Sequence, residues 1–312
     1  MRSKLLVTGA TGLLGHAVQV ICPGASYVSS RDYDLRDRQQ VEAMFEKYQP
    51  KHVLHLAACV GGVKHNAEHN ADLFTNNLLI NTHVLNCARE AKVDRLIGVI
   101  STCAFQIYDN QISTEKDLHV GLPFHGNLGY GYSKRTLDIQ TQLLNEQYGC
   151  RFSTIAPVTL YGPYDNCDLE NSHVLSALIH KCYLAKKNKT ALQVWGSGKA
   201  VRQFVFAPDI ARLLIAQIDK FDGPQTTVIA PDDGISIGEL AKLVAKTMRF
   251  DGKIEFDTSK PEGILKRVVK SEKNPSWLRD FKFTSFEKGL KKTMDWFVSH
   301  EANTASGLKV AS

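Results

Sequence analysis

The sequence predicts an α/β fold, in which a doubly wound parallel sheet is joined by a smaller C-terminal α/β domain. Between residues 4 and 157, short apolar runs alternate with longer amphipathic stretches, which is the rhythm of strand-helix-strand units in a parallel sheet. Most of these runs lack polar alternation, as is typical of strands that are covered on both faces. A glycine-rich turn also joins the first run to the stretch that follows it.

The five expected strands are rich in Val, Ile and Leu and are separated by stretches long enough for a helix. They span Lys4–Thr8, Tyr27–Ser29, His52–Leu56, Leu96–Ser101 and Phe152–Pro157. Helices are expected to fill the gaps between them, beginning with a helix over Leu13–Val20.

Two of the expected helices have the clearest helical periodicity. Their recurring positions are Leu73, Asn77, Ile80, Val84, Cys87 and Ala91 on one, and Leu137, Thr141, Leu144 and Tyr148 on the other. The first also carries Leu78, Leu79 and Leu85 off that face. A second apolar face suits packing against both the sheet and a partner subunit, so a homodimer is expected.

The pattern loosens in the second half of the chain, where Gly, Pro and Asn are mixed with helices expected over His173–Ala185 and Ile237–Thr247. We therefore expect residues 1–160 to form the first domain, together with some later segments. Residues 161–298 are expected to form mainly a substrate-binding domain. The small polar residues of 299–312 predict a flexible tail.

The composition is that of an ordinary globular protein, with 43% hydrophobic and 22% charged residues among 312. No segment approaches the roughly 20 consecutive apolar residues that a bilayer span requires, so we expect a soluble, cytoplasmic protein without a membrane partner. The net charge of +6 is modest and spread along the chain. That pattern does not favour nucleic-acid binding, although it is compatible with an anionic small substrate.

Neither a disulfide framework nor a metal site is expected. The seven cysteines are scattered and form no CxxC pair. His65, Glu68 and His69 match the HxxEH pattern of some zinc enzymes. No third ligand is marked out for them, so the interpretation is that no metal is bound.

Gly9, Gly12 and Gly15 form a GxxGxxG turn directly after the first expected strand and directly before the first expected helix. Glycine there lets the backbone turn tightly and approach a pyrophosphate, which then lies at the positive end of the helix. At the end of the second strand, the chain has Ser30 and Arg31 where an enzyme using NAD would place a carboxylate. A guanidinium with a hydroxyl suits a 2′-phosphate, so NADPH is favoured, although Asp32 is close by.

Tyr130 and Lys134 are four residues apart at the start of a helix and share one face of it. An ammonium beside a phenol stabilises the phenolate, so we expect Lys134 to lower the pKa of Tyr130 from its ordinary value of about 10. Ser101 ends the strand that precedes this helix, at the edge where open parallel sheets place their ligands.

Together with the glycine turn, Ser101, Tyr130 and Lys134 resemble the extended short-chain dehydrogenases/reductases, whose members transfer hydride between a nicotinamide and a sugar carbon. The resemblance implies a Rossmann-type sheet. It also implies that Ser101 holds the reacting oxygen, Tyr130 exchanges its proton and Lys134 grips the nicotinamide ribose. Further cofactor contacts are expected at Thr11, Leu13, Asp34, Leu35, Leu56, Ala57, Ala58, Asn77 and Pro157.

The residues after Ser101 bear on the reaction. Sugar-nucleotide dehydratases carry an Asp-Glu pair there, and this chain has Thr102 and Cys103 instead, so dehydration is disfavoured. A thiol can abstract the acidic proton next to a ketone, which makes Cys103 a candidate base. His173 is its natural counterpart, because epimerisation needs a proton removed from one face of the carbon and another delivered to the opposite face.

The resemblance extends to the GDP-L-fucose synthase family through Cys103 and four strings. These are Val60-Gly61-Gly62, Tyr161-Gly162-Pro163-Tyr164-Asp165-Asn166, Ser172-His173-Val174 and Trp195-Gly196-Ser197-Gly198. It implies epimerisation of GDP-4-keto-6-deoxy-D-mannose at C3 and C5, followed by NADPH-dependent reduction at C4, in a homodimer. It also implies that Lys181, Trp195 and Arg202 bind the GDP-sugar.

Two positions depart from that family's pattern: Gln106 stands where Pro is common, and Thr159 stands where Asn is usual. Two other functions stay open at this point. One is a different NADP-dependent epimerase or ketoreductase of sugar nucleotides. The other is a non-catalytic NADP-binding regulator, a class whose members typically lose the Tyr or the Lys that this chain retains.

Overall fold

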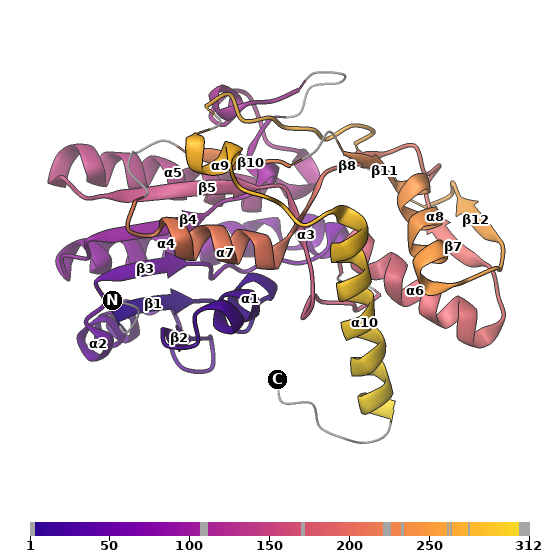
Figure 1. Ribbon diagram of the computed structural model, residues 1–312. Coiled ribbons are helices and arrows are strands. Elements are labelled where there is room, and N and C mark those ends of the chain that lie inside the picture. Colours follow the sequence, from indigo (N-terminus) through magenta and orange to yellow (C-terminus); the bar gives the residue numbers. More distant parts are fainter. Residues whose placement is uncertain are drawn as a thin grey trace.

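Figure 1 shows the computed structural model of the protein as a ribbon. The structure describes residues 4–106, 112–169, 172–220, 226–231, 234–260, 262, 264–273 and 275–305, with the backbone alone at residues 63, 64 and 302–305. Among these residues, no helix combines the length and the apolar character needed to cross a membrane.

The centre of the molecule is a sheet of six strands in the order β10-β5-β4-β3-β1-β2, and every pair of neighbours is parallel. The strands are Leu5–Thr8 (β1), Ser26–Val28 (β2), His52–His55 (β3), Arg95–Val99 (β4), Phe152–Pro157 (β5) and Thr227–Ile229 (β10). The sequence prediction of the first five is confirmed to within two residues at each end. The order reverses between β1 and β3, and such a reversal opens a ligand crevice at the carboxyl ends of the strands.

Helices cover both faces of the sheet. α1 (Leu13–Ile21) packs beside α7 (Ala207–Gln217), whereas α2 (Arg38–Tyr48), α4 (Asn70–Glu90) and α5 (Leu128–Tyr148) pack together on the other face (Figure 1). Right-handed crossovers require this arrangement, because the chain moves along the sheet in opposite directions after β1 and after β3. The doubly wound fold predicted from the sequence is therefore present.

Most of the periodic positions predicted for α4 and α5 are buried, but two predictions need correction. Leu85, which was expected off that face, is fully buried because α4 packs on α5 as well as on the sheet. Ala91 is exposed because it caps the end of α4. Tyr148, the last residue of α5, is half exposed, and the guanidinium of Arg89 lies 4.6 Å from its ring centroid.

A second hydrophobic core lies beside the first, on the right of Figure 1. Its main elements are α6 (Val174–Asn188), β7 (Leu192–Trp195), α8 (Ile237–Met248), β12 (Ile254–Asp257) and α10 (Phe286–Ala305). The two helices predicted in this half are confirmed, and each extends slightly beyond its predicted end. α10 continues to Ala305, past the predicted start of the tail at residue 299, because Ala and Glu continue the helix without a breaker.

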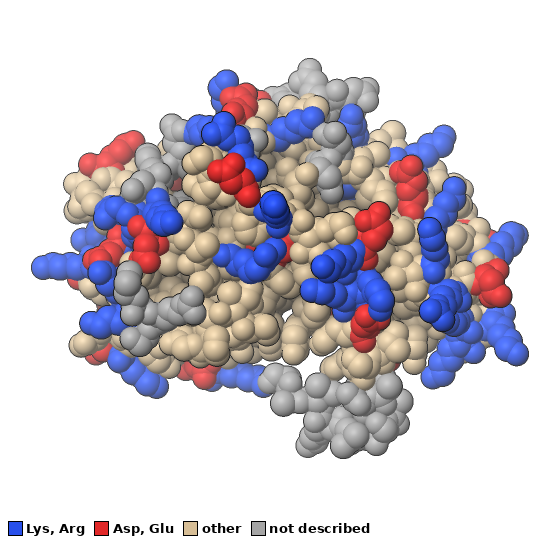
Figure 2. Space-filling model, viewed as in Figure 1, with Lys and Arg blue, Asp and Glu red and all other residues tan. Residues whose placement is uncertain are grey.

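Short elements join the two cores and carry much of the site. They are α3 (Val63–Glu68), the 3-10 turns Thr102–Ala104, Glu115–Asp117 and His125–Asn127, β6 (Thr159–Tyr161), β8 (Val201–Arg202), β9 (Phe204–Phe206), β11 (Ile235–Ser236) and α9 (Ser276–Arg279). β6 pairs with β9, β7 with β12, and β8 with β11. Lys and Arg are interspersed with Asp and Glu over the face shown in Figure 2, in keeping with the modest net charge.

Residues 264–273 form an extended segment, here called the strap, that crosses from the second core to the first. The backbone N–H of Val201 donates to the carbonyl oxygen of Leu265 at 2.7 Å. Further along, Val269 exchanges two hydrogen bonds with the buried side-chain amide of Gln203. A backbone bridge also joins Val269 to Ser113, so the strap is fixed at both ends.

Candidate active site

Many of the predicted site residues lie at the carboxyl end of the central sheet. Gly9 follows β1, Ala57 follows β3, Ser101 follows β4, and Pro157 ends β5. Parallel strands present these ends at one edge, so the fold gathers residues from four separate parts of the chain.

The glycine turn is tightly packed against its surroundings. Gly9 has a φ of 74°, and a Cβ there would lie 2.7 Å from the backbone nitrogen of Ala57. A Cβ on Gly15 would lie 2.3 Å from the carbonyl oxygen of Gly9, so the first turn of α1 sits directly on the loop. Gly12 caps α1 without a side-chain hydrogen bond. The backbone N–H groups of this first turn, which includes Leu13 and follows exposed Thr11, therefore suit a pyrophosphate.

The end of β2 suits the 2′-phosphate of NADP(H). Ser30 and Arg31 are exposed there. The carboxylate of Asp32 accepts hydrogen bonds from the backbone N–H and the hydroxyl of Ser29, both at 2.8 Å. These bonds lower the pKa of Asp32 and hold its charge within the turn. The carboxylate of Asp32 is thus turned toward Ser29.

The carboxylate of Asp34 forms an ion pair with Arg36 at 2.7 Å, and the hydrogen bonds to Arg36 lower the pKa of Asp34 to about 2. Leu35 is buried, and its carbonyl oxygen lies 3.2 Å from Nδ1 of His83.

Asn77 fixes the segment that follows β3, which includes Leu56, Ala57 and Ala58. Its amide accepts from the backbone N–H of Cys59 and donates to the carbonyl oxygen of Cys59, both at 2.8 Å. A buried imidazole missed by sequence reasoning supports the same region: His55 lies 2.9 Å from Oγ1 of Thr8 and 3.0 Å from Oδ1 of Asn81. Burial lowers the pKa of His55 to about 4, so this link is uncharged at neutral pH.

Ser101, Tyr130 and Lys134 come together between β4 and α5. Tyr130 is buried and hydrogen-bonded to the side chain of Ser101, and Nζ of Lys134 lies 5.6 Å from the ring centroid of Tyr130. The ammonium also donates to the carbonyl oxygen of Val99 at 2.8 Å. The three residues therefore share one desolvated site.

The pKa of Tyr130 differs from the sequence expectation. Burial raises the pKa of Tyr130 above its ordinary value, and this effect outweighs the hydrogen bond from Ser101, which lowers it. Burial also lowers the pKa of Lys134 to about 8. The expected lowering of the Tyr130 pKa by the neighbouring ammonium is not found in this chain, because desolvation dominates. Tyr130 is thus held in its protonated form, as a proton donor requires.

Cys103 lies in the 3-10 turn after Ser101, and its backbone N–H donates to Oγ of Ser101 at 3.2 Å. Nη1 of Arg267, on the strap, donates to Sγ of Cys103 at 3.4 Å. Arg202 interacts electrostatically with both Cys103 and Arg267. Burial and the neighbouring Arg267 lower the pKa of Arg202 to about 10.

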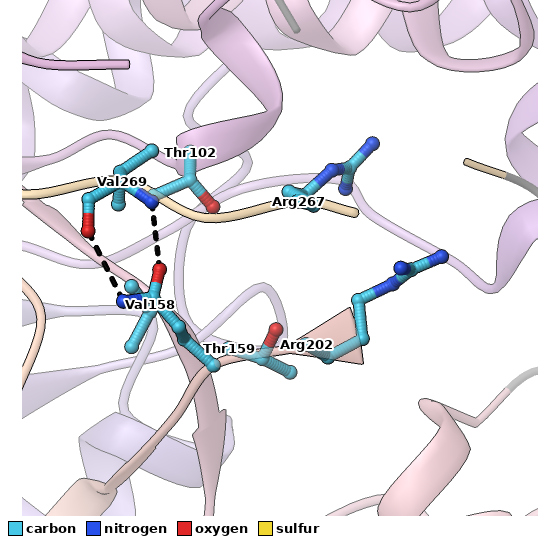
Figure 3. Close-up of a pocket in the computed structure, with 7 residues that line it drawn as sticks. Thr102, Val158, Thr159, Arg202, Arg267 and Val269 are labelled. Carbon is cyan, nitrogen blue, oxygen red and sulfur yellow. Dashed lines mark hydrogen bonds between the residues drawn. The ribbon is translucent and has the colours of Figure 1, made fainter. Parts of the chain in front are cut away.

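A small pocket contains both arginines (Figure 3). Their guanidinium groups extend to the same side of it. It is lined by Thr102, Val158, Thr159, Arg202, Gln203, Arg267 and Val269. Sequence reasoning missed Arg267, which lies in an irregular segment with neither helical nor strand periodicity.

His173 caps α6 at its N-terminus and is exposed. It interacts electrostatically with buried Asp165, the carboxylate of which accepts a hydrogen bond from the hydroxyl of Ser176. Burial raises the pKa of Asp165. The structure thus places His173 at the start of a helix, beside the carboxyl group of Asp165. Its pairing with Cys103 stays a prediction.

The three predicted substrate residues fall into two groups. Nζ of Lys181, on α6, lies 4.2 Å from the ring centroid of Trp195, which is half exposed at the end of β7. Burial lowers the pKa of Lys181. Arg202 lies apart from this pair, on β8 beside the strap, and Glu262 interacts with it electrostatically. Glu262 also accepts a hydrogen bond from Ser197 at 2.6 Å, which anchors the loop between the two groups.

The two departures from the family pattern differ in position. The side chain of Gln106 lies against Gly121, where a Cβ would overlap it. Gln106 therefore packs on the loop that follows the 3-10 turn of Cys103. Thr159 lines the pocket with Arg202 and Arg267, so this departure can affect a ligand.

The HxxEH residues do not form a metal-binding group among the residues described. The rings of His65 and His69 lie 4.5 Å apart, and His69 pairs with Asp72. Among the described residues, Glu42, Cys87 and Glu90 have ligand atoms spaced closely enough to hold a metal ion. Arg38 donates hydrogen bonds to both glutamates of this set.

Comparison with known proteins agrees with this geometry. The NAD dependent epimerase/dehydratase family matches residues 5–230. The chain is 36% identical to a GDP-L-fucose synthase of Dictyostelium discoideum, over 96% of each chain, and 31% identical to GDP-L-fucose synthase 1 of Arabidopsis thaliana, over 96% of this chain and 95% of that one. The structure resembles a GDP-L-fucose synthetase from Naegleria fowleri bound to NADP, with a TM-score of 0.89 and 35% identity over 99% of this chain and 96% of the other.

Proposed function

The chain belongs to the NAD dependent epimerase/dehydratase family and, within it, to the GDP-L-fucose synthases, and from this premise we propose that it converts GDP-4-keto-6-deoxy-D-mannose into GDP-L-fucose with NADPH. The observation that carries the proposal is the arrangement after β4. There, a serine, a buried tyrosine and a lysine suited to reduction lie next to a thiol that faces a guanidinium.

The cofactor is NADP(H), which when bound supplies a hydride to the C4 carbon of the sugar. The glycine turn before α1 holds its pyrophosphate, and Ser30 and Arg31 hold the 2′-phosphate. The engagement of Asp32 by Ser29 supports this assignment, because an outward carboxylate would repel a phosphate.

Epimerisation comes first. The C4 ketone acidifies the C–H bonds at C3 and C5, and Cys103 as a thiolate removes a proton to leave an enolate. Ser101 and Tyr130 stabilise the oxygen of that enolate as hydrogen-bond donors. The imidazolium of His173 delivers a proton to the opposite face, so the configuration is inverted and the proton balance is kept.

Reduction follows in the same pocket. As C4 receives hydride, the hydroxyl of Tyr130 donates its proton to the C4 oxygen, while Ser101 holds that oxygen. The burial that raises the pKa of Tyr130 suits this direction of transfer, because it keeps the donor protonated at neutral pH. Lys134 orients the nicotinamide ribose. Its ammonium also stabilises the negative charge of the phenolate that remains when Tyr130 gives up its proton.

Lys181, Trp195 and Arg202 hold the GDP portion. A guanidinium and an ammonium make charge-assisted contacts to a diphosphate, and the half-exposed indole offers a flat surface to the guanine. The partial desolvation of both cations strengthens such contacts.

Product analysis tests the function. Incubation with GDP-4-keto-6-deoxy-D-mannose and NADPH should oxidise the cofactor and yield GDP-L-fucose, as identified by NMR. Tyr130→Phe keeps the ring and loses the proton donor, so its NADPH oxidation should fall by about a hundred-fold or more. A reduced product that is not GDP-L-fucose would favour another ketoreductase, and no NADPH oxidation with any GDP-linked ketosugar would favour a regulator.

We further propose a homodimer formed through α4 and α5. Leu79, Ile139 and Leu143 are large apolar residues on these helices that stay 38%, 44% and 55% exposed. A four-helix contact between two copies would cover them. Light scattering after gel filtration should give the dimer mass for the wild type and a monomer mass for Leu143→Glu. Val20→Glu, which charges an equally prominent apolar residue on α1, should leave the dimer intact.

A further inference from the structure

The strap places Arg267 against the thiol of Cys103, and this contact extends the catalytic site beyond the residues assigned above. The Nη1–Sγ distance of 3.4 Å is within hydrogen-bonding range for sulfur. Since Cys103 and Arg267 are 164 positions apart in sequence, the pairing depends on the fold rather than on local geometry.

The backbone of Arg267 is held in place on both sides. The N–H of Arg267 donates to the carbonyl oxygen of Val201 at 3.3 Å, and Lys266 forms a backbone bridge to Val201. On the other side, buried Val268 and Val269 anchor the strap, with Val269 bonded to Gln203. The side chain of Arg267 therefore starts from a fixed backbone position, across from the 3-10 turn that contains Cys103.

Arg267 is also held at a cost. Its Nε is buried and has no hydrogen-bond partner among the residues that the structure describes. An unsatisfied buried donor destabilises the folded state, and the guanidinium lies beside the like charge of Arg202. Such a cost at a pocket wall is typical of a group kept for its chemistry rather than for stability.

Three charged or titratable side chains of the described residues interact with the thiol of Cys103. Tyr130 faces Cys103 from α5, Arg202 from β8 and Arg267 from the strap. Tyr130 is neutral at physiological pH because burial raises its pKa. Of the two arginines, Arg267 makes the hydrogen bond to sulfur.

We propose that Arg267 is a positioning residue of the epimerase reaction, which stabilises Cys103 as the thiolate and directs its sulfur toward the substrate. A thiolate is the form of cysteine that can take a proton from carbon, and an adjacent guanidinium favours that form. The role of Arg267 in the reaction rests on the proposed function, whereas its contact with Cys103 does not.

Alkylation of Cys103 tests the contact without any substrate. The rate of iodoacetamide modification at pH 7 is followed at the Cys103 peptide by mass spectrometry. In Arg267→Met this rate should fall about ten-fold, because the guanidinium no longer favours the reactive thiolate. Arg267→Lys should restore part of the difference. Lys266→Met, which removes an exposed charge from the adjacent strap position, should match the wild type.

Deuterium exchange into the sugar then tests the role. With GDP-4-keto-6-deoxy-D-mannose in deuterated water, exchange at C3 and C5 by Arg267→Met should fall about ten-fold at pH 7, with KM changed less than three-fold. An unchanged alkylation rate in Arg267→Met overturns the proposal. So does a large rise in KM with normal exchange at saturation, which would make Arg267 a diphosphate ligand. Slower alkylation in Arg267→Met, together with no exchange even in the wild type, would leave the contact standing and count against the proposed function.

Discussion

At the scale of single residues, the proposed mechanism divides the chemistry between Cys103, which acts on carbon-bound protons, and Tyr130, which acts on the C4 oxygen. Cys103 lies in the turn that follows β4, whereas Tyr130 approaches from α5. The two residues belong to different elements, so each can be changed without displacing the other.

Cys103→Ser retains size and a hydroxyl but replaces a thiolate with a far weaker base. In deuterated water, the wild type should place deuterium at C3 and C5 of the product, and the variant should lose both exchanges while NADPH still binds. NMR of the product gives the measurement. Exchange at the wild-type rate in the variant would show that the thiol only fills space. His173→Gln offers the contrast, since proton removal can continue there while inversion is lost.

Arg31 determines cofactor preference in this interpretation. Arg31→Asp removes an attraction to the 2′-phosphate and adds a repulsion, so the ratio of kcat/KM for NADPH over NADH should fall about ten-fold or more, which corresponds to about 1.4 kcal/mol. Steady-state kinetics with both cofactors checks this. Asp32→Asn should change the ratio little, because that carboxylate is turned toward Ser29. An unaltered NADPH preference in Arg31→Asp would remove the assignment.

The burial of the Lys134 ammonium lowers the stability of the folded state. Burial lowers its pKa from 10.5 to about 8, and a shift of this size costs about 3 kcal/mol when the ammonium is charged. Because the folded pKa lies below the unfolded value, this cost is fully present below pH 8 and fades as pH rises from 8 to 10.5. A variant that removes the ammonium gains this stability but also loses the hydrogen bond to Val99, which offsets about 1 kcal/mol of the gain.

Lys134→Met should therefore be at least as stable as the wild type at pH 7 and inactive in reduction. Its advantage should shrink by about 1.4 kcal/mol per pH unit above pH 8. Urea unfolding at pH 7 and pH 9.5 measures the difference between the two proteins, in which other titrating groups cancel. A difference that stays constant between the two pH values would contradict the assignment of the lowered pKa to Lys134.

At the scale of elements, the first five strands of the central sheet could be predicted because they are rich in apolar residues and are separated by stretches long enough for a helix. The small pairs of the second core were not predicted: β8 and β11 have two residues each, and β7 alternates between buried and exposed positions. β10 was missed for a similar reason, since three residues carry little periodicity.

The candidate site divides in the same way. Ser101, Tyr130 and Lys134 follow recognisable spacings on a strand and a helix, so they could be found from the sequence. Arg267 lies on a strap held by backbone pairing to β8, which leaves no pattern in the side chains. The raised pKa of Tyr130 depends on how deeply α5 is buried, and spacing does not report that.

The contact between α1 and the glycine turn gives a prediction for an element. Gly15→Ala would place a Cβ 2.3 Å from the carbonyl oxygen of Gly9 and 2.6 Å from that of Ala10, so helix and turn must move apart. We expect a loss of about 1–3 kcal/mol in stability and at least a ten-fold weaker affinity for NADPH. Fluorescence titration and thermal unfolding measure both effects. Gly24→Ala, which would meet no atom within 4 Å, is the control. Normal NADPH affinity in Gly15→Ala would argue against this turn as the pyrophosphate site.

At the scale of the whole molecule, the two cores are assembled from interleaved parts of the chain. α7 and β10 return to the first core, and Val269 and Leu278 add to it from further on. The second core begins at Tyr161 and is completed by Leu290, Met294 and Phe297 of α10. Neither core belongs to one continuous segment.

A fragment of residues 1–160 should therefore not fold on its own. It lacks α7, which covers α1, and β10, which covers the edge of β5, so it exposes both a buried helix face and a strand edge. Expression of the fragment should yield aggregated protein, or soluble protein without cooperative unfolding in circular dichroism. A soluble fragment that unfolds cooperatively and binds NADPH would show that the first domain is complete at residue 160.

The two neighbouring arginines of the pocket also bear on how the protein responds to its solvent. Burial and Arg267 lower the pKa of Arg202 to about 10, so the charge of Arg202 is held at a cost in free energy that an anion bound at this residue would reduce. A small polyanion that binds there stabilises the folded state by mass action. Phosphate, sulfate or pyrophosphate should thus raise the melting temperature and, at the same concentrations, compete with the GDP-sugar. The same preparation should then give a higher KM in phosphate than in a zwitterionic buffer of equal pH and ionic strength.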